Sequence, residues 1–293
     1  MDKGIIIKGI GGFYYVQRIN SDIVECKARG IFRKDKITPM VGDEVLITII
    51  DDGQGIIEDI LPRKNQLIRP PVTNIDQAII VFSLLNPNPN FQLIDRFLVQ
   101  GEKQNLSLII CINKIDIVSN IKSKEEEIQD MYKNTGYPII FTSVKENIGI
   151  EDLTKNLENH ITVFAGPSGV GKSSLLNKIN TDYNLETGII SSKISRGRHT
   201  TRHVELLSYG INGHVVDTPG FSSLSMDNIK EEELMYFFPE FNKYIGKCKF
   251  NSCIHIHEPN CAIIDALHEG KIKESRYKNY NYFMTEIKNN REY

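Results

Sequence analysis

The sequence predicts a multi-domain protein, with an all-β barrel first, an α/β P-loop fold in the middle and a mostly helical part last. Three observations predict this order. Short β-like runs fill residues 1–65, and a strand, a glycine-rich loop and a helix start follow one another over residues 160–179. Cysteines and histidines then cluster over residues 248–261. The domain boundaries expected from these features are 1–65, 66–225 and 226–293.

The composition is that of an ordinary globular protein, with 40% hydrophobic and 25% charged residues among 293. The formal net charge of −2 argues against a surface that coats nucleic acid uniformly, but it allows a local basic patch. No signal peptide is recognisable, and no stretch reaches the roughly 20 apolar residues of a membrane span. We therefore expect a cytoplasmic protein without a membrane partner.

The N-terminal region contains five β-like runs separated by Gly, Asp and Asn turns: GIIIKGI, GFYYVQRI, DIVECKARGIF, DEVLITII and GQGIIEDIL. Five short strands in about 65 residues fit an OB-fold barrel, whose face commonly binds nucleic acid. Residues 27–36 carry five basic residues against Asp35, with Phe32 among them. Basic residues interleaved with an aromatic suit phosphate contact and base stacking, so we expect RNA contact here. The alternative is a solvated loop with one core aromatic.

The stretch GPSGVGKSSLLNKI at residues 166–179 fits the pattern G-x-x-x-x-G-K-[ST]. A β-branched strand precedes it and apolar residues at helical spacing follow it. Backbone N–H groups and a helix N-terminus should therefore form an anion cradle. Lys172 should reach the β- and γ-phosphates, and the Ser173 hydroxyl should bind Mg²⁺. The residues expected to contact the nucleotide are Gly166, Pro167, Ser168, Gly169, Val170, Gly171, Lys172, Ser173 and Ser174.

Two loops upstream of the phosphate loop are suited to a guanine base. The apolar run in NLSLIICINKID ends at Asn113, Lys114 and Asp116. The Asp116 carboxylate can accept hydrogen bonds from guanine N1 and the 2-amino group, a donor pair that adenine lacks. Asn113 and the Lys114 stem would brace the loop and cover the base. N-K-x-D is a weak match alone and a much stronger one at the C-terminal end of such a strand.

The second of these loops follows the strand in YPIIFTSVKE and is less specific. A backbone N–H of this loop is expected to meet the guanine oxygen. The loop consists of Ser143, Val144 and Lys145.

Two segments downstream of the phosphate loop are suited to the γ-phosphate and its metal ion. Residues 193–202 carry four basic residues and no acidic one, and either Thr200 or Thr201 could place a hydroxyl on Mg²⁺. Such a long polar segment is a candidate switch loop. The strand in GINGHVVDTPGF ends at Asp217, which is expected to hold Mg²⁺, and the Gly220 N–H is expected to meet the γ-phosphate.

These motifs indicate a GTPase, but their order along the chain is unusual. The guanine-reading loops precede the phosphate loop, and D-T-P-G at 217–220 comes last. The common arrangement places the phosphate loop first, so the sequence predicts a circularly permuted GTPase sheet. Whatever follows D-T-P-G is then tied directly to a segment that responds to the γ-phosphate. Many GTPases carry a water-orienting Gln just after D-x-x-G, but Phe221 occupies that position here.

Three of the five cysteines lie near histidines in CKFNSCIHIHEPNC. Their spacing is Cys248-x4-Cys253-x-His255-x5-Cys261, and three thiolates with one imidazole make a closed, tetrahedral and therefore structural Zn²⁺ site. His257 competes with His255 on spacing alone. The segment after the cluster is predicted to be helical, and its lysines, tyrosines and Arg276 could face RNA, although acidic residues nearly balance the basic ones.

The chain resembles the RsgA (YjeQ/YloQ) family, the circularly permuted GTPases that depend on the small ribosomal subunit. The resemblance covers nearly the whole chain, through GGFYYV, C-K-A-R-G, N-K-I-D, GPSGVGKSSLLN, GRHTT, DTPGF and the cysteine cluster. It implies an OB-fold, a permuted GTPase domain, a zinc-containing C-terminal domain and a role in late maturation of the small subunit. It also implies that His199 replaces the missing Gln and that His255 completes the zinc site.

We therefore expect a monomeric GTP hydrolase that binds the small subunit and its rRNA in the GTP state and leaves after hydrolysis. Lys172 and His199 are the expected catalytic residues. One alternative is a guanine-nucleotide-sensing, RNA-binding scaffold with negligible turnover, which Phe221 favours for the free protein. A second is an ATP-using P-loop enzyme, against which the N-K-I-D motif argues.

Overall fold

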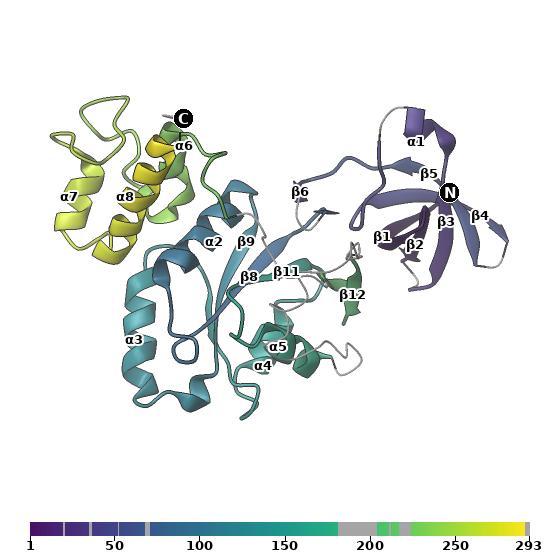
Figure 1. Cartoon of the computed structure of the whole chain (residues 1–293), viewed down its shortest axis with the longest axis horizontal. Helices are drawn as coiled ribbons and strands as arrows, with labels where there is room; N and C mark the ends of the chain where they lie inside the picture. The colour runs from purple at the N-terminus through teal and green to yellow at the C-terminus, as the bar shows by residue number, and fades with distance from the viewer. Residues whose placement is uncertain are drawn as a thin grey trace.

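The structure is a computed structural model with three parts arranged in chain order (Figure 1). The barrel lies at one end, an α/β sheet lies in the middle, and a helical part that contains the C-terminus lies at the other end. The structure describes residues 1–19, 21–34, 37–51, 53–67, 71–180, 204–210, 212–216 and 224–290.

The N-terminal part is a closed five-stranded barrel with the strand order β1-β2-β3-β5-β4. Alternate strand residues point inward, so side chains such as Val16 and Ile57 are fully buried. A short helix, α1 (Gly30–Lys34), follows the third strand. The strands are β1 (Asp2–Ile10), β2 (Phe13–Arg18), β3 (Ile23–Ala28), β4 (Glu44–Asp51) and β5 (Gln54–Ile60). The predicted all-β barrel is confirmed.

A two-stranded ribbon, β6 (Gln66–Leu67) and β7 (Val72–Thr73), joins the barrel to the sheet. The buried Asp43 carboxylate of the barrel accepts two hydrogen bonds from Arg63 at 2.7 and 2.8 Å and one from the Thr73 hydroxyl at 2.8 Å. Gly42, at φ +91°, lies so close to Thr73 that a Cβ atom would be 2.1 Å from its carbonyl oxygen. The linker is therefore packed tightly against the barrel.

The central sheet has six strands in the order β10-β9-β8-β11-β13-β12. All its pairs are parallel except the pair of β12 with β13. Every residue of β8 is buried, because helices cover both faces of a parallel sheet. Its strands are β8 (Gln77–Ser83), β9 (Ser107–Asn113), β10 (Ile139–Phe141), β11 (Ile161–Ala165), β12 (Leu206–Tyr209) and β13 (Gly213–Val216).

The helices of the central part are α2 (Phe91–Lys103), α3 (Ile121–Tyr132), α4 (Ile150–Lys155) and α5 (Lys172–Ile179), with a short 3-10 turn, η1 (Ile115–Ile117). Asn90 caps α2, because its side-chain oxygen accepts the Leu93 N–H at 3.0 Å. α2 ends at Lys103, where the Gln104 N–H bonds back to the carbonyls of Gly101 and Glu102. Among the described residues, none of the helices combines the length and the apolar character needed to cross a membrane.

The C-terminal part is mostly helical, as predicted. It consists of α6 (Glu231–Leu234), the 3-10 turns η4 (Met235–Phe237) and η5 (Pro239–Phe241), α7 (Ala262–His268) and α8 (Glu274–Asn289). Its core is aromatic: the Phe238 ring lies 5.3 Å from the Phe241 ring and 5.3 Å from the Tyr280 ring. This part also packs on α2, where Arg96 pairs with Glu286.

Candidate nucleotide site and metal centre

The phosphate loop connects β11 at the centre of the sheet to the start of α5. Two of its glycines are required by close packing. At Gly166, φ is +142° and a Cβ atom would lie 2.0 Å from the Val81 carbonyl oxygen. At Gly171, φ is +94° and a Cβ atom would lie 2.5 Å from the Asn113 side-chain nitrogen. The loop can therefore hold this compact shape only with glycine at both positions.

Lys172 opens α5 and folds back over the loop. Its Nζ donates hydrogen bonds to the carbonyl oxygens of Gly166 at 2.8 Å and Pro167 at 2.7 Å. Burial lowers the pKa of Lys172 to about 8, because the charged ammonium is partly removed from water. Ser173 and Ser174 are half-buried in the same helical turn. An anionic ligand in the loop would supply a counter-charge and favour the charged form of this ammonium.

The N-K-I-D loop at the end of β9 is hydrogen-bonded directly to the phosphate loop. Asn113 Nδ2 donates to the Val170 carbonyl at 2.9 Å, and the Asn113 side-chain oxygen accepts from the Thr142 hydroxyl at 3.1 Å. Lys114 adopts φ +64°, and its Nζ donates to the carbonyls of Gly169 at 2.6 Å and Asn86 at 2.7 Å. The loop expected to read the base and the loop expected to hold the phosphates thus form one unit.

The second base loop is held against the first by Asp116. The Ser143 hydroxyl is buried and donates to Asp116 Oδ1 at 2.7 Å, while it accepts the Glu146 N–H at 3.1 Å. Val144 is half-buried and Lys145 is exposed at the same edge of the sheet. Thr142 and Asn86 also take part in this network and were not singled out from the sequence. Thr142 directly precedes the predicted loop of Ser143, Val144 and Lys145, which is the signal that could have identified it.

The metal-binding residues expected from the sequence lie together in the C-terminal part. One ligand atom from each of Cys248, Cys253, His255 and Cys261 lies within 4.8 Å of all the others. His257 is exposed and lies outside this group. The Cys248 and Cys261 sulfurs are 3.8 Å apart, and His255 Nδ1 is 3.5 Å from the Cys248 sulfur and 3.3 Å from the Cys261 sulfur. Zn–S bonds of about 2.3 Å arranged tetrahedrally give the same sulfur separation, about 3.8 Å.

Hydrogen bonds around the cluster hold its backbone in place. Tyr277 donates to the His255 carbonyl at 2.7 Å, and Tyr280 donates to the Ile254 carbonyl at 2.8 Å. Burial raises the pKa of Glu258, but hydrogen bonds from backbone N–H groups, including that of Ile254, outweigh it and bring the pKa to about 2. The carboxylate therefore stays charged and clamps the loop that carries His255.

Comparisons with known proteins agree with this geometry. The family model described as RsgA GTPase matches residues 60–227, more than half of the chain. The model described as RsgA N-terminal domain matches residues 3–57. The chain belongs to the RsgA family.

Relatives in this family extend over the whole chain. The small ribosomal subunit biogenesis GTPase RsgA of Alkaliphilus metalliredigens is 52% identical, with 100% of both chains covered. The RsgA of Bacillus cereus is 48% identical, with 98% of each covered. Among solved structures, YloQ, a circularly permuted GTPase, superposes with a TM-score of 0.86 at 42% identity, covering 99% of this chain and 96% of that one. YjeQ from Thermotoga maritima gives 0.87 at 38% identity, covering 98% of each chain.

Membership of the RsgA family identifies the central sheet as a circularly permuted GTPase fold, as predicted. Several residues that the sequence assigns to its site lie outside the described residues, and the structure does not test them. They are His199, Thr200, Thr201, Asp217, Gly220 and Phe221.

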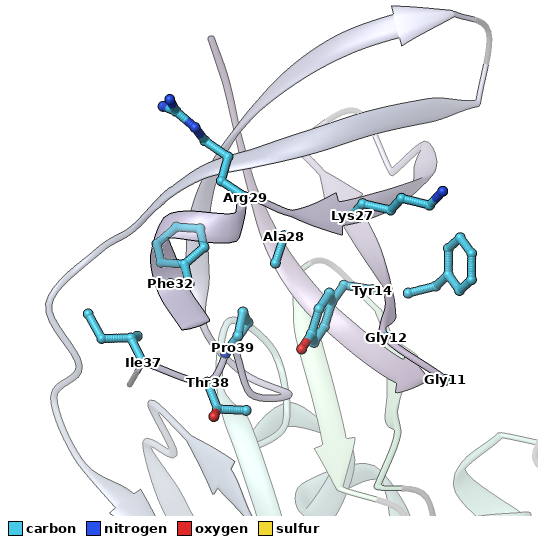
Figure 2. A pocket seen from close by; sticks show the side chains of 11 residues that line it. Gly11, Gly12, Tyr14, Lys27, Ala28, Arg29, Phe32, Ile37, Thr38 and Pro39 are labelled. Atoms are coloured by element: carbon cyan, nitrogen blue, oxygen red, sulfur yellow. The ribbon is translucent and has the colours of Figure 1, made fainter. Parts of the chain in front are cut away.

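The barrel carries a cavity of about 370 Å³ next to the predicted RNA-contact segment (Figure 2). The turn between β1 and β2 forms one side, and Lys27 and Arg29 lie at its edge. Phe32 is 6% exposed, because α1 turns its ring into the barrel core, so the alternative of a core aromatic is confirmed for Phe32 and base stacking by its ring is not. Phe13 is 37% exposed with the Lys27 ammonium 5.0 Å from its ring centre, and so offers the accessible aromatic face that the sequence argument assigned to Phe32.

One further expectation from the sequence is wrong. Arg276 does not face RNA but is 1% exposed between α8 and the rest of the C-terminal part. Its Nε donates to Glu240 at 2.7 Å, and it also pairs with Asp95 of α2. The basic residue was visible in the sequence, but the two buried acidic partners come from residues 36 and 181 positions away in the chain, so no local pattern reveals them.

Proposed function

We propose that this chain is a GTP hydrolase that acts in late maturation of the small ribosomal subunit, is stimulated by that subunit and leaves it after hydrolysis. The observation that carries the proposal is the pair of hydrogen bonds that lock the N-K-I-D loop onto the phosphate loop, from Asn113 to Val170 and from Lys114 to Gly169. Relatives with full coverage carry the name small ribosomal subunit biogenesis GTPase RsgA.

In this proposal the Asp116 carboxylate accepts both guanine donors, with its orientation set by the Ser143 hydroxyl. ATP presents no such donor pair, so a desolvated carboxylate would reject it. The phosphates occupy the loop at residues 166–174, where Lys172 exchanges its two carbonyl partners for phosphate oxygens. Residues of the chain would hold Mg²⁺, which neutralises phosphate charge: the hydroxyl of Ser173, that of Thr200 or Thr201, and Asp217.

Catalysis is assigned to His199 together with Lys172. Phe221 cannot orient water by hydrogen bonding, so another side chain must do so. The surrounding segment, residues 193–202, carries four basic residues and no acidic one. These charges repel one another until an anionic partner binds, and rRNA phosphate is such a partner. We expect subunit binding to bring His199 to the attacking water, and positioned acid–base groups contribute roughly 10²–10⁴-fold in rate.

The partners follow from the two ends of the molecule. Lys27, Arg29 and the exposed Phe13 around the barrel cavity suit a phosphate and a base of the small-subunit rRNA.

The ion at the Cys248, Cys253, His255 and Cys261 cluster is Zn²⁺ with a structural role, because four protein ligands leave no open position. The protein would act as a monomer in the cytoplasm, where the subunits are assembled. A scaffold without turnover is not favoured, since relatives over the full length are named GTPases.

The test is GTP turnover by the purified protein alone, with small subunits and with large subunits. We expect slow turnover alone and a rise of about 100-fold or more with small subunits only. His199→Ala should bind GTP and the subunit normally yet lose most of the rise, whereas His268→Ala, at the end of α7 away from the site, should keep it. Equal turnover under all three conditions would contradict the proposed function. A rise that survives in His199→Ala would place the catalytic group elsewhere.

A further inference from the structure

The barrel contacts the edge of the GTPase sheet through β1. Over Asp2–Ile5, β1 pairs with β4. Its pairing with β2 shifts register between Ile6 and Lys8 and continues with Lys8 opposite Tyr15, and Lys8 also forms an antiparallel bridge with Glu205. The Lys8 ammonium also lies 2.8 Å from the Glu205 carboxylate, with about a third of each side chain exposed. Bulges of this kind redirect a strand edge, and here the redirected edge meets the residue that precedes β12.

A second contact comes from β2. The Gln17 side-chain oxygen lies 2.8 Å from His214 Nε2 on β13 and 3.2 Å from the Ser208 hydroxyl on β12. Ser208 and His214 face each other in the antiparallel pair, so one barrel side chain holds both strands. His214 is 7% exposed, and burial lowers its pKa, so a neutral ring donates to Gln17. The barrel and the strands β12 and β13 therefore form a specific interface that includes a buried side chain.

The β12–β13 hairpin lies between the two segments assigned to the γ-phosphate. Glu205 and β12 come directly after residues 181–203, which contain Thr200 and Thr201. At the other end, Val216 closes β13 and is followed at once by Asp217. β13 itself is fixed to the centre of the sheet, where His214 N donates to the His160 carbonyl at 2.9 Å. A displacement of the hairpin would therefore move the base of both segments.

The barrel is also fixed to the sheet at a second point. Asp43, Arg63 and Thr73 join it to the linker ribbon, and Asp76, at the far end of that ribbon, accepts the Ile161 N–H of β11 at 2.8 Å. The barrel is thus attached to the sheet both at the linker ribbon and at the β12–β13 hairpin, so a rotation of the barrel about one attachment displaces the other. Force on the barrel is thus passed to the β12–β13 hairpin and not absorbed by a loose linker.

We propose that Gln17 and Lys8 are positioning residues of the GTPase: they hold the β12–β13 hairpin from the barrel side and so couple RNA bound on the barrel to the two nucleotide-contacting segments. This rests on the proposed function. Neither residue touches the nucleotide. By linkage, the nucleotide state must change the affinity of the barrel for RNA by the same factor by which RNA changes nucleotide affinity.

The test compares two substitutions at Gln17. Gln17→Leu keeps the size but removes the acceptor, whereas Gln17→Glu keeps an acceptor for His214 and Ser208 and should rescue. Gln54→Leu on β5, exposed on the same barrel and away from β12, is the matched control. We measure the ratio of small-subunit affinity with a non-hydrolysable GTP analogue to that with GDP, and kcat and KM for subunit-stimulated turnover. The loss of one such hydrogen-bond network corresponds to about a two- to tenfold change in an affinity or a rate constant.

We expect Gln17→Leu to lower the affinity ratio and the stimulated kcat by about three- to tenfold, while Gln17→Glu and Gln54→Leu stay within about twofold of the parent protein. If the parent is stimulated and Gln17→Leu matches it, the coupling proposal is overturned and the proposed function stands. If the parent is not stimulated, the proposed function fails.

A measurement without subunits then decides the coupling proposal by itself. Amide hydrogen exchange of residues 4–18 is followed in the GDP and GTP-analogue states. In the parent and in Gln17→Glu, exchange in β1 and β2 should differ between the two states, and in Gln17→Leu that difference should disappear. Identical exchange in both states of the parent would overturn the proposal.

Discussion

At the scale of single residues, the burial of Lys172 should make nucleotide affinity depend on pH. Its pKa is lowered to about 8 because burial removes water from around the charged ammonium. Below pH 8 the lysine is charged before the nucleotide arrives. Above pH 8 the free protein has lost that proton, yet the phosphates favour the charged form. Nucleotide binding must therefore take up a proton, and affinity should fall as pH rises through 8.

We predict that GDP affinity is constant between pH 7 and 7.5 and falls by up to about tenfold per pH unit above pH 8. Titration calorimetry in buffers of different ionisation enthalpy should show proton uptake over the same range, below the pH at which guanine loses its own N1 proton. Lys172→Arg is the control, because a guanidinium stays charged throughout. A flat affinity profile for the parent protein would mean that Lys172 is charged already or does not meet the phosphates.

At the scale of elements, α2 joins the GTPase sheet to the C-terminal part. Arg96 Nη1 donates to the Leu224 carbonyl and Gln100 donates to the Ser225 carbonyl, each at 2.9 Å. The chain that follows D-T-P-G is thus attached to α2 as well as to the segment that we expect to contact the γ-phosphate. The buried pair of Asp95 with Arg276 completes this attachment. The C-terminal part is therefore packed on α2 through both of its ends.

We predict that Arg276→Ala destabilises the protein by about 3–5 kcal/mol, because it leaves the buried carboxylates of Asp95 and Glu240 without their cation. Lys278→Ala lies on the same helix, in an exposed pair with Glu274, and should cost less than about 1 kcal/mol. Urea unfolding followed by circular dichroism measures both. Equal losses of stability from the two substitutions would contradict the stabilising role of the buried ion pairs of Arg276 with Asp95 and Glu240.

The metal cluster makes a second prediction at this scale. Protein prepared without chelators should hold one Zn²⁺ per chain, and Cys261→Ser should lose it, because three ligands bind the ion far more weakly than four. Cys26→Ala, in the barrel, removes a cysteine outside the cluster and should retain the metal. Metal analysis reads out the ion, and limited proteolysis should show new cleavage mainly after residue 226. A metal-free parent protein would contradict the zinc assignment.

The same elements show what the sequence can predict. The strands β8 and β9 and the phosphate loop are predictable because each is encoded by a continuous local pattern of apolar residues and glycines. The contact between Asn113 and Val170 joins residues 57 positions apart, so only the motif resemblance hinted at it. α1 is too short to show a helical period, and for that reason the sequence left open whether Phe32 stacks on a base or lies in the core. The contact of Gln17 with His214 has no sequence signal, because it depends on how the barrel packs.

At the scale of the whole molecule, the proposed nucleotide site lies in the central part, between the barrel expected to contact RNA and the C-terminal part (Figure 1). The barrel holds one edge of the sheet through Lys8 and Gln17, and the C-terminal part is attached to α2. In the proposed function, subunit contact on the barrel would therefore act on the sheet through β12 and β13, an input that the free protein lacks.

The central claim is that GTP turnover on the small subunit takes place in this site. Asp116→Asn exchanges a carboxylate for an amide, which pairs poorly with the guanine N1 and 2-amino donors but accommodates the oxygen that xanthine carries in place of the amino group. Hydrolysis of GTP and of xanthosine triphosphate is measured for parent and variant, with and without small subunits. We predict that the parent uses GTP alone and that the variant loses at least about 100-fold in GTP turnover while its xanthosine triphosphate hydrolysis becomes subunit-stimulated. A variant that still hydrolyses GTP like the parent on the subunit would contradict the account.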